Sequence, residues 1–164
     1  MKRFLLPAGI VALLCALPAK GQQPSEQDSV RMYELQQIEV TATRATPTTP
    51  VAYSDIRREE IARNSYGTDI PTLLALTPSM IATNETGIGI GGTAVRLRGT
   101  DPTRLNVTIN GVAMNNPDSH SMYWYDTPDL VSAVGSIQVQ RGAGISTNGT
   151  GAFGGAVNMS TDAL

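Results

Sequence analysis

The chain has 164 residues, of which 12 are basic and 14 acidic. This length accommodates one domain with extensions, and 16 Gly with 10 Pro favour short strands and many turns. The acidic balance, without a basic patch, argues against a nucleic-acid-binding protein, because neutralisation of phosphates supplies most of that affinity.

The N-terminal end has the pattern of an export signal. Lys2 and Arg3 precede an apolar run over residues 4–17, and Ala19 and Gly21 are small residues at the two positions that a signal peptidase checks. This pattern suits a signal peptidase, so that the mature chain would begin at Gln22. The run is too short to span a membrane, which takes about 20 apolar residues. A buried N-terminal helix is the alternative.

Cleavage after residue 21 would change the composition of the remaining chain. It would remove Cys15, the only cysteine, and with it any structural disulfide or thiolate metal site. It would also reduce the basic residues from 12 to nine, all of them Arg, and so leave a net charge of −5.

Residues 22–50 are expected to form a flexible tail. Their start is polar, and the Thr- and Pro-rich residues 45–50 cannot continue a helix. Between these parts, residues 37–44 are rich in β-branched side chains and predict a short extended segment with a free backbone edge. Composition alone favours a disordered spacer or an ordinary edge strand over a specific binding segment.

Two helices are expected next. Ser54 can cap the first, over residues 55–63. Thr68 can cap the second, which carries Leu73, Leu74 and Leu76 on its buried side and ends before a proline.

The glycine-rich residues 84–92 predict a flexible loop. Gly87, Gly89 and Gly92 satisfy a dinucleotide-binding fingerprint. That fingerprint requires a helix to follow, so that its N-terminus meets the pyrophosphate, whereas the pattern that follows here is that of a strand. The spacing therefore gives little support to a nucleotide site.

Four later segments alternate apolar and polar residues with period two, which is typical of half-buried strands. They centre on residues 95–98, 105–109, 137–140 and 157–160. Asn110-Gly111 predicts a hairpin after the second segment, and Thr127-Pro128 predicts a short helix before the third. The expected fold class is α+β, a small mixed sheet with short helices on its apolar face. The other face, rich in Arg, Asn, Gln and Thr, is expected to be solvated.

The residues that most often carry catalysis give little support for an enzyme. The single histidine, His120, and the acidic residues near it match no metal-ligand spacing and no nucleophile elbow. Three aromatic residues lie within residues 122–125, where they can contact a ligand or pack the loop on itself.

A set of short motifs follows in a fixed order. Two predicted strands end in Arg98-Gly99 and Arg141-Gly142, a hairpin turns at Asn110-Gly111, and Gly154-Gly155 precedes an apolar-Asn pair. In this order, residues 95–160 resemble the plug domain of TonB-dependent outer-membrane receptors.

Two upstream segments extend this resemblance. Residues 73–80 resemble the family's helix that leads into a Pro-Gly-Val stretch, with Ser79 in place of the usual Gly. Residues 38–43 resemble a TonB box. Each motif is weak by itself, but the set in order after an export signal is specific to the family.

The resemblance implies roles for individual residues. The TonB-box-like segment would add as a strand to the C-terminal domain of TonB in the periplasm, through Ile38, Glu39, Val40, Thr41, Ala42 and Thr43. Arg98 and Arg141 would contact acidic groups on the inner wall of a barrel. Loops 84–92 and 115–126 would face the incoming ligand, with Asn84, Gly87, Gly91, Asn115, Asn116, Tyr123 and Trp124.

The implied function is to gate the energised uptake of a scarce ligand, such as a siderophore or cobalamin, through a 22-stranded barrel in the outer membrane. It involves no cofactor, no metal site and no enzymatic activity. A barrel of that size takes roughly 200 residues before its loops. The chain is therefore expected to consist of a signal peptide (1–21), a tail (22–50) and a plug domain (51–164), without the barrel.

Other functions remain open at the level of sequence. A stand-alone periplasmic binding module could use the same plug fold, and a nucleotide-dependent enzyme would use the glycines of loop 84–92. Siderophore, cobalamin, haem and glycan receptors share the plug motifs, so the substrate is not indicated.

Overall fold

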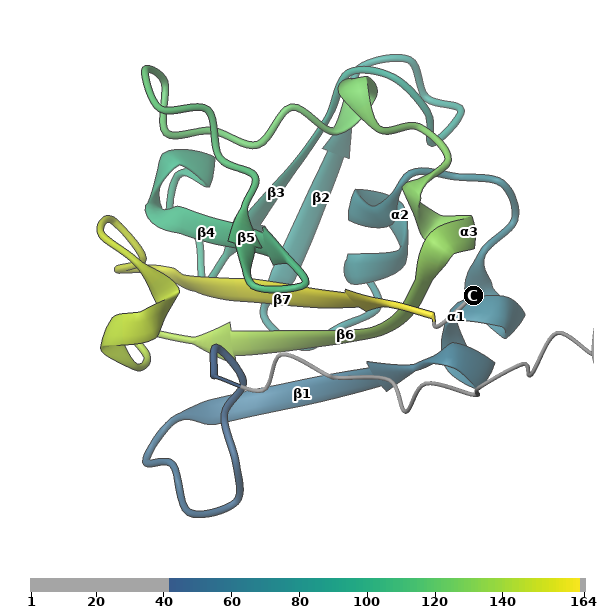
Figure 1. The fold of residues 1–164 in the computed structure, drawn as a ribbon. Helices are drawn as coiled ribbons and strands as arrows, with labels where there is room; N and C mark the ends of the chain where they lie inside the picture. Colours follow the sequence, from purple (N-terminus) through teal and green to yellow (C-terminus); the bar gives the residue numbers. More distant parts are fainter. Residues whose placement is uncertain (1–41, 163–164) are drawn as a thin grey trace, which may run out of the picture. The chain divides into compact units, whose positions relative to one another are not determined.

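The computed structural model describes residues 42–162 (Figure 1). The expected signal peptide and residues 38–41 of the TonB-box-like segment lie outside the described residues. Within the described range, no helix combines the length and the apolar character needed to cross a membrane.

A five-stranded sheet forms the centre of the described fold, with strand order β1-β6-β7-β4-β5. β4 and β7 run parallel, and the other neighbouring strands run antiparallel. The expected α+β class with a mixed sheet is confirmed. The strands are β1 (Ala52–Arg57), β4 (Leu105–Ile109), β5 (Val112–Ala113), β6 (Val134–Arg141) and β7 (Gly155–Thr161).

A second, two-stranded sheet accompanies the first. β2 (Met80–Asn84) pairs antiparallel with β3 (Thr93–Leu97). The sequence patterns predicted a single sheet that included residues 95–98, and this was wrong because β3 pairs with β2 instead of joining the larger sheet. Short helices complete the fold: α1 (Arg58–Asn64), α2 (Ile70–Leu74) and α3 (Leu130–Ala133), with 3₁₀ turns at Pro102–Arg104, Trp124–Asp126 and Ser146–Asn148.

The hydrophobic core lies on one face of the five-stranded sheet. Ile137 and Val139 of β6 and Val157 of β7 are each 0 % exposed there. They belong to one cluster with apolar side chains from α1, α2, α3, β2 and β3. The helices therefore cover the apolar face, as the alternation of residues predicted (Figure 1).

The structure divides the first predicted helix, over residues 55–63, between a strand and a helix. Residues 52–57 form β1, in which Ser54 pairs with Val139 and Ile56 with Ile137 of β6. α1 begins only at Arg58. The free edge of β6 offers a full row of backbone partners to residues 52–57, and this long-range pairing overrides the local capping signal at Ser54.

The hairpin and its turn agree with the prediction. Ile109 pairs with Val112 across the turn, and both turn residues have positive φ angles, 49° at Asn110 and 80° at Gly111. Asn-Gly tolerates this geometry, which matches the right-handed twist of the strands.

Gly154-Gly155 has a steric explanation. At Gly155 a Cβ atom would overlap the backbone carbonyl oxygen of Gln140 and would lie 2.5 Å from Leu97 Cδ2. Only glycine allows β7 to begin this close to β6 and β3.

Candidate functional site

The polar face of the five-stranded sheet is covered by the chain itself. Gln138 and Gln140 of β6 and Asn158 of β7 are 3 %, 0 % and 1 % exposed. The backbone of residues 42–45, at the start of the described chain, forms hydrogen bonds with these side chains. Asn148 of a 3₁₀ turn also bonds to one of them, Gln140. The expectation of a solvated face was therefore wrong. We call Gln138, Gln140, Asn148 and Asn158 the amide cluster.

The amide cluster binds the main chain of residues 42–45. Gln140 Nε2 and Asn158 Nδ2 both donate to the carbonyl oxygen of Thr43, at 2.7 and 2.8 Å. Gln138 bonds both main-chain groups of Ala45: its Oε1 accepts from the amide at 2.6 Å, and its Nε2 donates to the carbonyl at 3.1 Å. This pairing reproduces what a neighbouring strand would offer, with a side chain in place of a backbone.

Hydrogen bonds also connect the cluster members to one another. Gln140 Nε2 donates to Gln138 Oε1 at 2.9 Å, and Asn148 Nδ2 donates to Gln140 Oε1 at 2.7 Å. Asn158 Oδ1 accepts from the hydroxyl of Thr108 at 2.8 Å. Every amide of the cluster has partners, and the buried side-chain atoms without one in the described part of the chain lie elsewhere. A fully satisfied buried network fixes one arrangement of its members.

Flanking contacts hold the same segment. Arg44 Nη2 donates to the hydroxyl oxygens of Ser136 and Ser160, at 2.6 and 3.1 Å. Thr147 Oγ1 donates to the carbonyl of Ala42 at 2.9 Å. Thr43 and Ala45 are only 7 % and 6 % exposed. The expectation of a flexible tail is therefore wrong for residues 42–45, because the polar sheet face supplies partners for their backbone.

The two arginines expected to contact a barrel lie near one another. Arg141 Nε donates to the carbonyl of Pro78 at 3.2 Å, and its Nη2 donates to Ser54 Oγ at 2.5 Å. The backbone amide of Arg98 donates to the carbonyl of Ser79, the next residue along, at 2.8 Å. Arg98 is exposed, and within the described range no hydrogen bond or ion pair engages its guanidinium.

Loop 84–92 is shaped by its own polar groups. Asn84 Oδ1 accepts from the amides of Thr86 and Gly87, both at 2.9 Å. The amide of Gly91 donates to Asp69 Oδ2 at 2.9 Å. Gly87 and Gly91 take positive φ angles of 76° and 99°. β3 follows the loop directly, so no helix begins where the nucleotide fingerprint would need one.

Loop 115–126 is organised by two asparagines. Asn115 Oδ1 accepts from the amide of Val107 at 2.7 Å, and its Nδ2 donates to the carbonyls of Leu105 and His120, both at 2.8 Å. Asn116 Oδ1 accepts from two amides further along the loop, at 2.9 and 3.1 Å. These asparagines shape the loop, and their expected contact with a ligand remains a prediction.

The aromatic residues of this loop divide between core and surface. Trp124 is 3 % exposed and belongs to the hydrophobic core, so its assignment to a ligand-facing surface was wrong. The apolar ring is removed from water by the core beneath the loop. Tyr123 contacts Tyr125 with ring centroids 5.5 Å apart, and Tyr125 is 54 % exposed.

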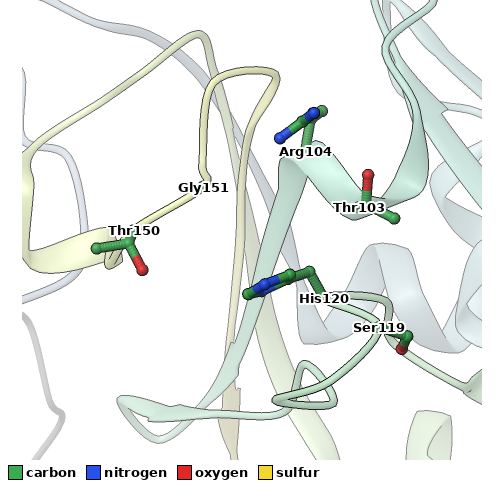
Figure 2. A pocket seen from close by; sticks show the side chains of 6 residues that line it. All are labelled: Thr103, Arg104, Ser119, His120, Thr150 and Gly151. Carbon is green, nitrogen blue, oxygen red and sulfur yellow. The ribbon is translucent and has the colours of Figure 1, made fainter.

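A cleft of about 330 Å³ lies beside this loop (Figure 2). Its lining combines two cationic or titratable side chains with hydroxyls and one glycine: Thr103, Arg104, Ser119, His120, Thr150 and Gly151. Asn106 connects this cleft to the amide cluster, because its Nδ2 donates to the carbonyls of both Asn148 and Thr150.

Electrostatic contacts around the cleft are exposed and modest. Asp101 accepts hydrogen bonds from the backbone amide and the hydroxyl of Thr103, and these bonds lower the pKa of Asp101. Arg96 Nη1 lies 3.6 Å from Asp101 Oδ2. Between residues 42 and 162, no group of three His, Cys, Asp or Glu side chains could hold a metal ion.

Comparison with known proteins identifies the family to which this fold belongs. The family model described as "TonB-dependent Receptor Plug Domain" matches residues 45–156. No curated protein matches the sequence.

Solved receptor structures share the fold. The alcaligin outer-membrane receptor FauA from Bordetella pertussis is 23 % identical, with a TM-score of 0.56, over 76 % of this chain and 21 % of that one. A mutant of the ferric enterobactin receptor PfeA from Pseudomonas aeruginosa is 23 % identical, with a TM-score of 0.54, over 78 % of this chain and 19 % of that one. The siderophore receptor PirA from Acinetobacter baumannii is 22 % identical, with a TM-score of 0.51, over 68 % and 17 %. The chain thus spans about a fifth of the length of these receptors.

Proposed function

This chain belongs to the TonB-dependent receptor plug family, and we propose that it gates energised uptake of a scarce ligand across the outer membrane. The ligand would be a metal chelate such as a siderophore, or a molecule of similar scarcity such as cobalamin. A transmembrane β-barrel would surround the plug. The match of the family model over residues 45–156 carries this proposal, and the protein would act in transport without catalysing a reaction.

The TonB-box-like segment is the proposed contact with the energy source. Residues 38–43 would add as a strand to the C-terminal domain of TonB at the periplasmic side. Their β-branched composition supports this, since strand addition draws its affinity from backbone hydrogen bonds. Thr43 and its neighbours in the described chain already bond through main-chain groups, which is the same mode of recognition.

The proposed contacts with the barrel wall use Arg98 and Arg141. The exposed guanidinium of Arg98, which no described residue engages, supports a partner outside this domain. Arg141 has internal partners at Ser54 and Pro78, so it would contact an acidic group while also bracing β1.

The ligand would meet the plug at two loops. Loop 84–92 presents Ile88, which is 71 % exposed, and loop 115–126 presents Tyr125, which is 54 % exposed. Exposed apolar and aromatic side chains of this kind anchor recognition. Of the residues expected to face the ligand, Asn84, Gly87, Gly91, Asn115, Asn116 and Tyr123 remain proposed, and Trp124 is withdrawn.

Strand addition can be tested with a peptide. A peptide of residues 37–44 should bind the purified C-terminal domain of TonB in a calorimetric titration. Val40→Pro in the same peptide should abolish this binding, because proline lacks the N–H that a paired strand donates. Val40→Thr, which keeps the β-branched shape and the backbone donor, is the matched control. Equal binding by the proline and threonine peptides would contradict recognition through the backbone.

A further inference from the structure

We propose that the cleft beside Arg104 and His120 binds the carboxylate or phosphate group of a small molecule. The inference goes beyond the proposed function, because it concerns a property of the described domain that needs neither TonB nor a barrel. The cleft measures about 330 Å³, at the lower end of the range of small-molecule pockets. It would therefore hold a small acidic molecule, or the acidic part of a larger one.

A cationic and a titratable side chain line the cleft from different elements. Arg104 ends the 3₁₀ turn before β4, and His120 belongs to loop 115–126. Figure 2 shows both side chains extending toward the loop that carries Thr150 and Gly151. An anion between these elements would meet both side chains at once.

The charge of Arg104 is not neutralised within the described domain. Its guanidinium forms no ion pair or hydrogen bond with any residue between 42 and 162. Its Cζ lies 5.9 Å from the centroid of the Phe153 ring, a contact that orients the guanidinium without cancelling its charge. The imidazole of His120 also has no hydrogen-bond partner in this range. Both groups therefore keep donors for a ligand.

The surroundings of the cleft contain little negative charge. Its lining residues include no Asp or Glu, and residues 142–154, which form one wall, carry no charged side chain. Asp101 and Asp118, the acidic residues closest in sequence, are not among the lining residues. The Asp101 carboxylate already accepts two hydrogen bonds from Thr103 and lies 3.6 Å from Arg96 Nη1. An anion in the cleft would meet no strong repulsion.

Neutral donors add to the two side chains. Ser119 Oγ accepts from the hydroxyl of Tyr123 and the amide of Ser121, at 3.0 and 3.4 Å, so its own proton is left to donate. No residue of the described chain accepts from the hydroxyl of Thr150, or from the amides of Thr150 and Gly151. An oxyanion offers several acceptor positions to such a set of donors.

Hydrogen bonds join the walls of the cleft. The amide of Gly154 donates to the carbonyl of Arg104 at 2.9 Å, and Asn106 Nδ2 donates to the carbonyl of Thr150 at 3.3 Å. These bonds hold the wall formed by residues 142–154 against the start of β4. Donors that are already in place bind a ligand without a further cost of ordering.

The position of His120 is held through its backbone. Its φ angle is 57°, in the left-handed region that residues with side chains rarely adopt. Its amide donates to the carbonyl of Asn116 at 2.9 Å, and its carbonyl accepts from Asn115 Nδ2 at 2.8 Å. Bonds on both sides of the residue therefore keep this conformation, and with it the direction of the imidazole.

The single histidine of the chain makes the test direct. In an NMR titration of the purified chain at about pH 6, where an imidazole is largely charged, the His120 signals should shift and saturate at millimolar or lower concentrations of citrate, inorganic phosphate or both. A response to citrate alone would identify a carboxylate site, and a response to phosphate alone a phosphate site. Sodium chloride of equal ionic strength should leave the signals in place.

Charge variants locate the site in the same titration. Arg104→Gln should weaken binding of the responding anion about tenfold, as expected when a hydrogen bond between charged groups is lost. Arg104→Lys keeps the charge but loses the planar fork of donors, and should weaken binding less. Arg63→Gln is the matched control: it removes the same charge from the last turn of α1, and should leave the affinity within about twofold.

Two results would overturn the proposal. His120 signals that respond to neither anion, or no more than to chloride, would show that the cleft binds no oxyanion. Equal losses in Arg104→Gln and Arg63→Gln would show attraction to the overall charge of the chain instead of a site. Neither result bears on TonB, so the proposed function and this cleft can fail separately.

Discussion

Single side chains decide how closely the segments of this domain approach one another. Gln138 replaces a neighbouring strand by bonding both main-chain groups of Ala45, and the absence of a side chain at Gly155 lets β7 begin beside the carbonyl of Gln140. These two positions act in opposite ways. The side chain of Gln138 supplies hydrogen bonds that hold the backbone of Ala45 on the sheet. Gly155 lacks the Cβ atom that would prevent β7 from approaching the carbonyl of Gln140.

The steric role of Gly155 predicts a large effect of the smallest side chain. Gly155→Ala should destabilise the fold by about 2 kcal/mol or more, because the added Cβ overlaps the Gln140 carbonyl oxygen. Urea denaturation of the purified chain measures the loss.

Gly151→Ala is the control for this substitution. Gly151 also has a positive φ angle, 92°, but nothing lies within 4 Å of the position a Cβ would take. It should therefore show only the cost of backbone strain, roughly 1 kcal/mol. Equal losses at Gly151 and Gly155 would refute the steric explanation.

At the scale of elements, local patterns identified some strands and missed others. The alternation in residues 105–109, 137–140 and 157–160 predicted β4, β6 and β7, and Asn110-Gly111 predicted the hairpin. Each of these signals lies within a few neighbouring residues. β1 was mistaken for a helix because its pairing partner, β6, lies about 80 residues later in the chain, which no local signal records.

The buried polar face escaped prediction for the same reason. Gln138, Gln140 and Asn158 were correctly assigned to the non-apolar face of the sheet. What covers that face is the backbone of residues 42–45, in contacts that span 93 to 115 positions. Because these contacts use main-chain atoms, the side chains of residues 42–45 gave no indication of them.

β1 contributes a single buried apolar side chain, and this gives a prediction about the element. Ile56 is 5 % exposed and packs in the core. Ile56→Ala should cost about 2–4 kcal/mol of unfolding free energy through lost burial and a cavity. Ile81→Ala makes the same change at a position that is 56 % exposed, and should fall within about 0.5 kcal/mol of the unaltered chain. Similar losses at both positions would show that β1 is not anchored through Ile56.

At the scale of the whole described domain, the two faces of the sheet have different tasks. One face holds the hydrophobic core and keeps the fold together. The other face, through the amide cluster, binds the main chain of residues 42–45. Asn106 joins the amide cluster to the cleft beside Arg104 and His120, so the polar face also connects residues 42–45 to a surface loop.

The central claim is that the chain reaches TonB through backbone pairing of residues 38–43. The most direct measurement compares the affinity of the TonB C-terminal domain for the full chain with its affinity for the Val40→Pro variant of the full chain. The account predicts that the unaltered chain binds and that Val40→Pro loses this binding, because proline lacks the N–H that a paired strand donates. Equal affinities, or no binding by the unaltered chain, would contradict it.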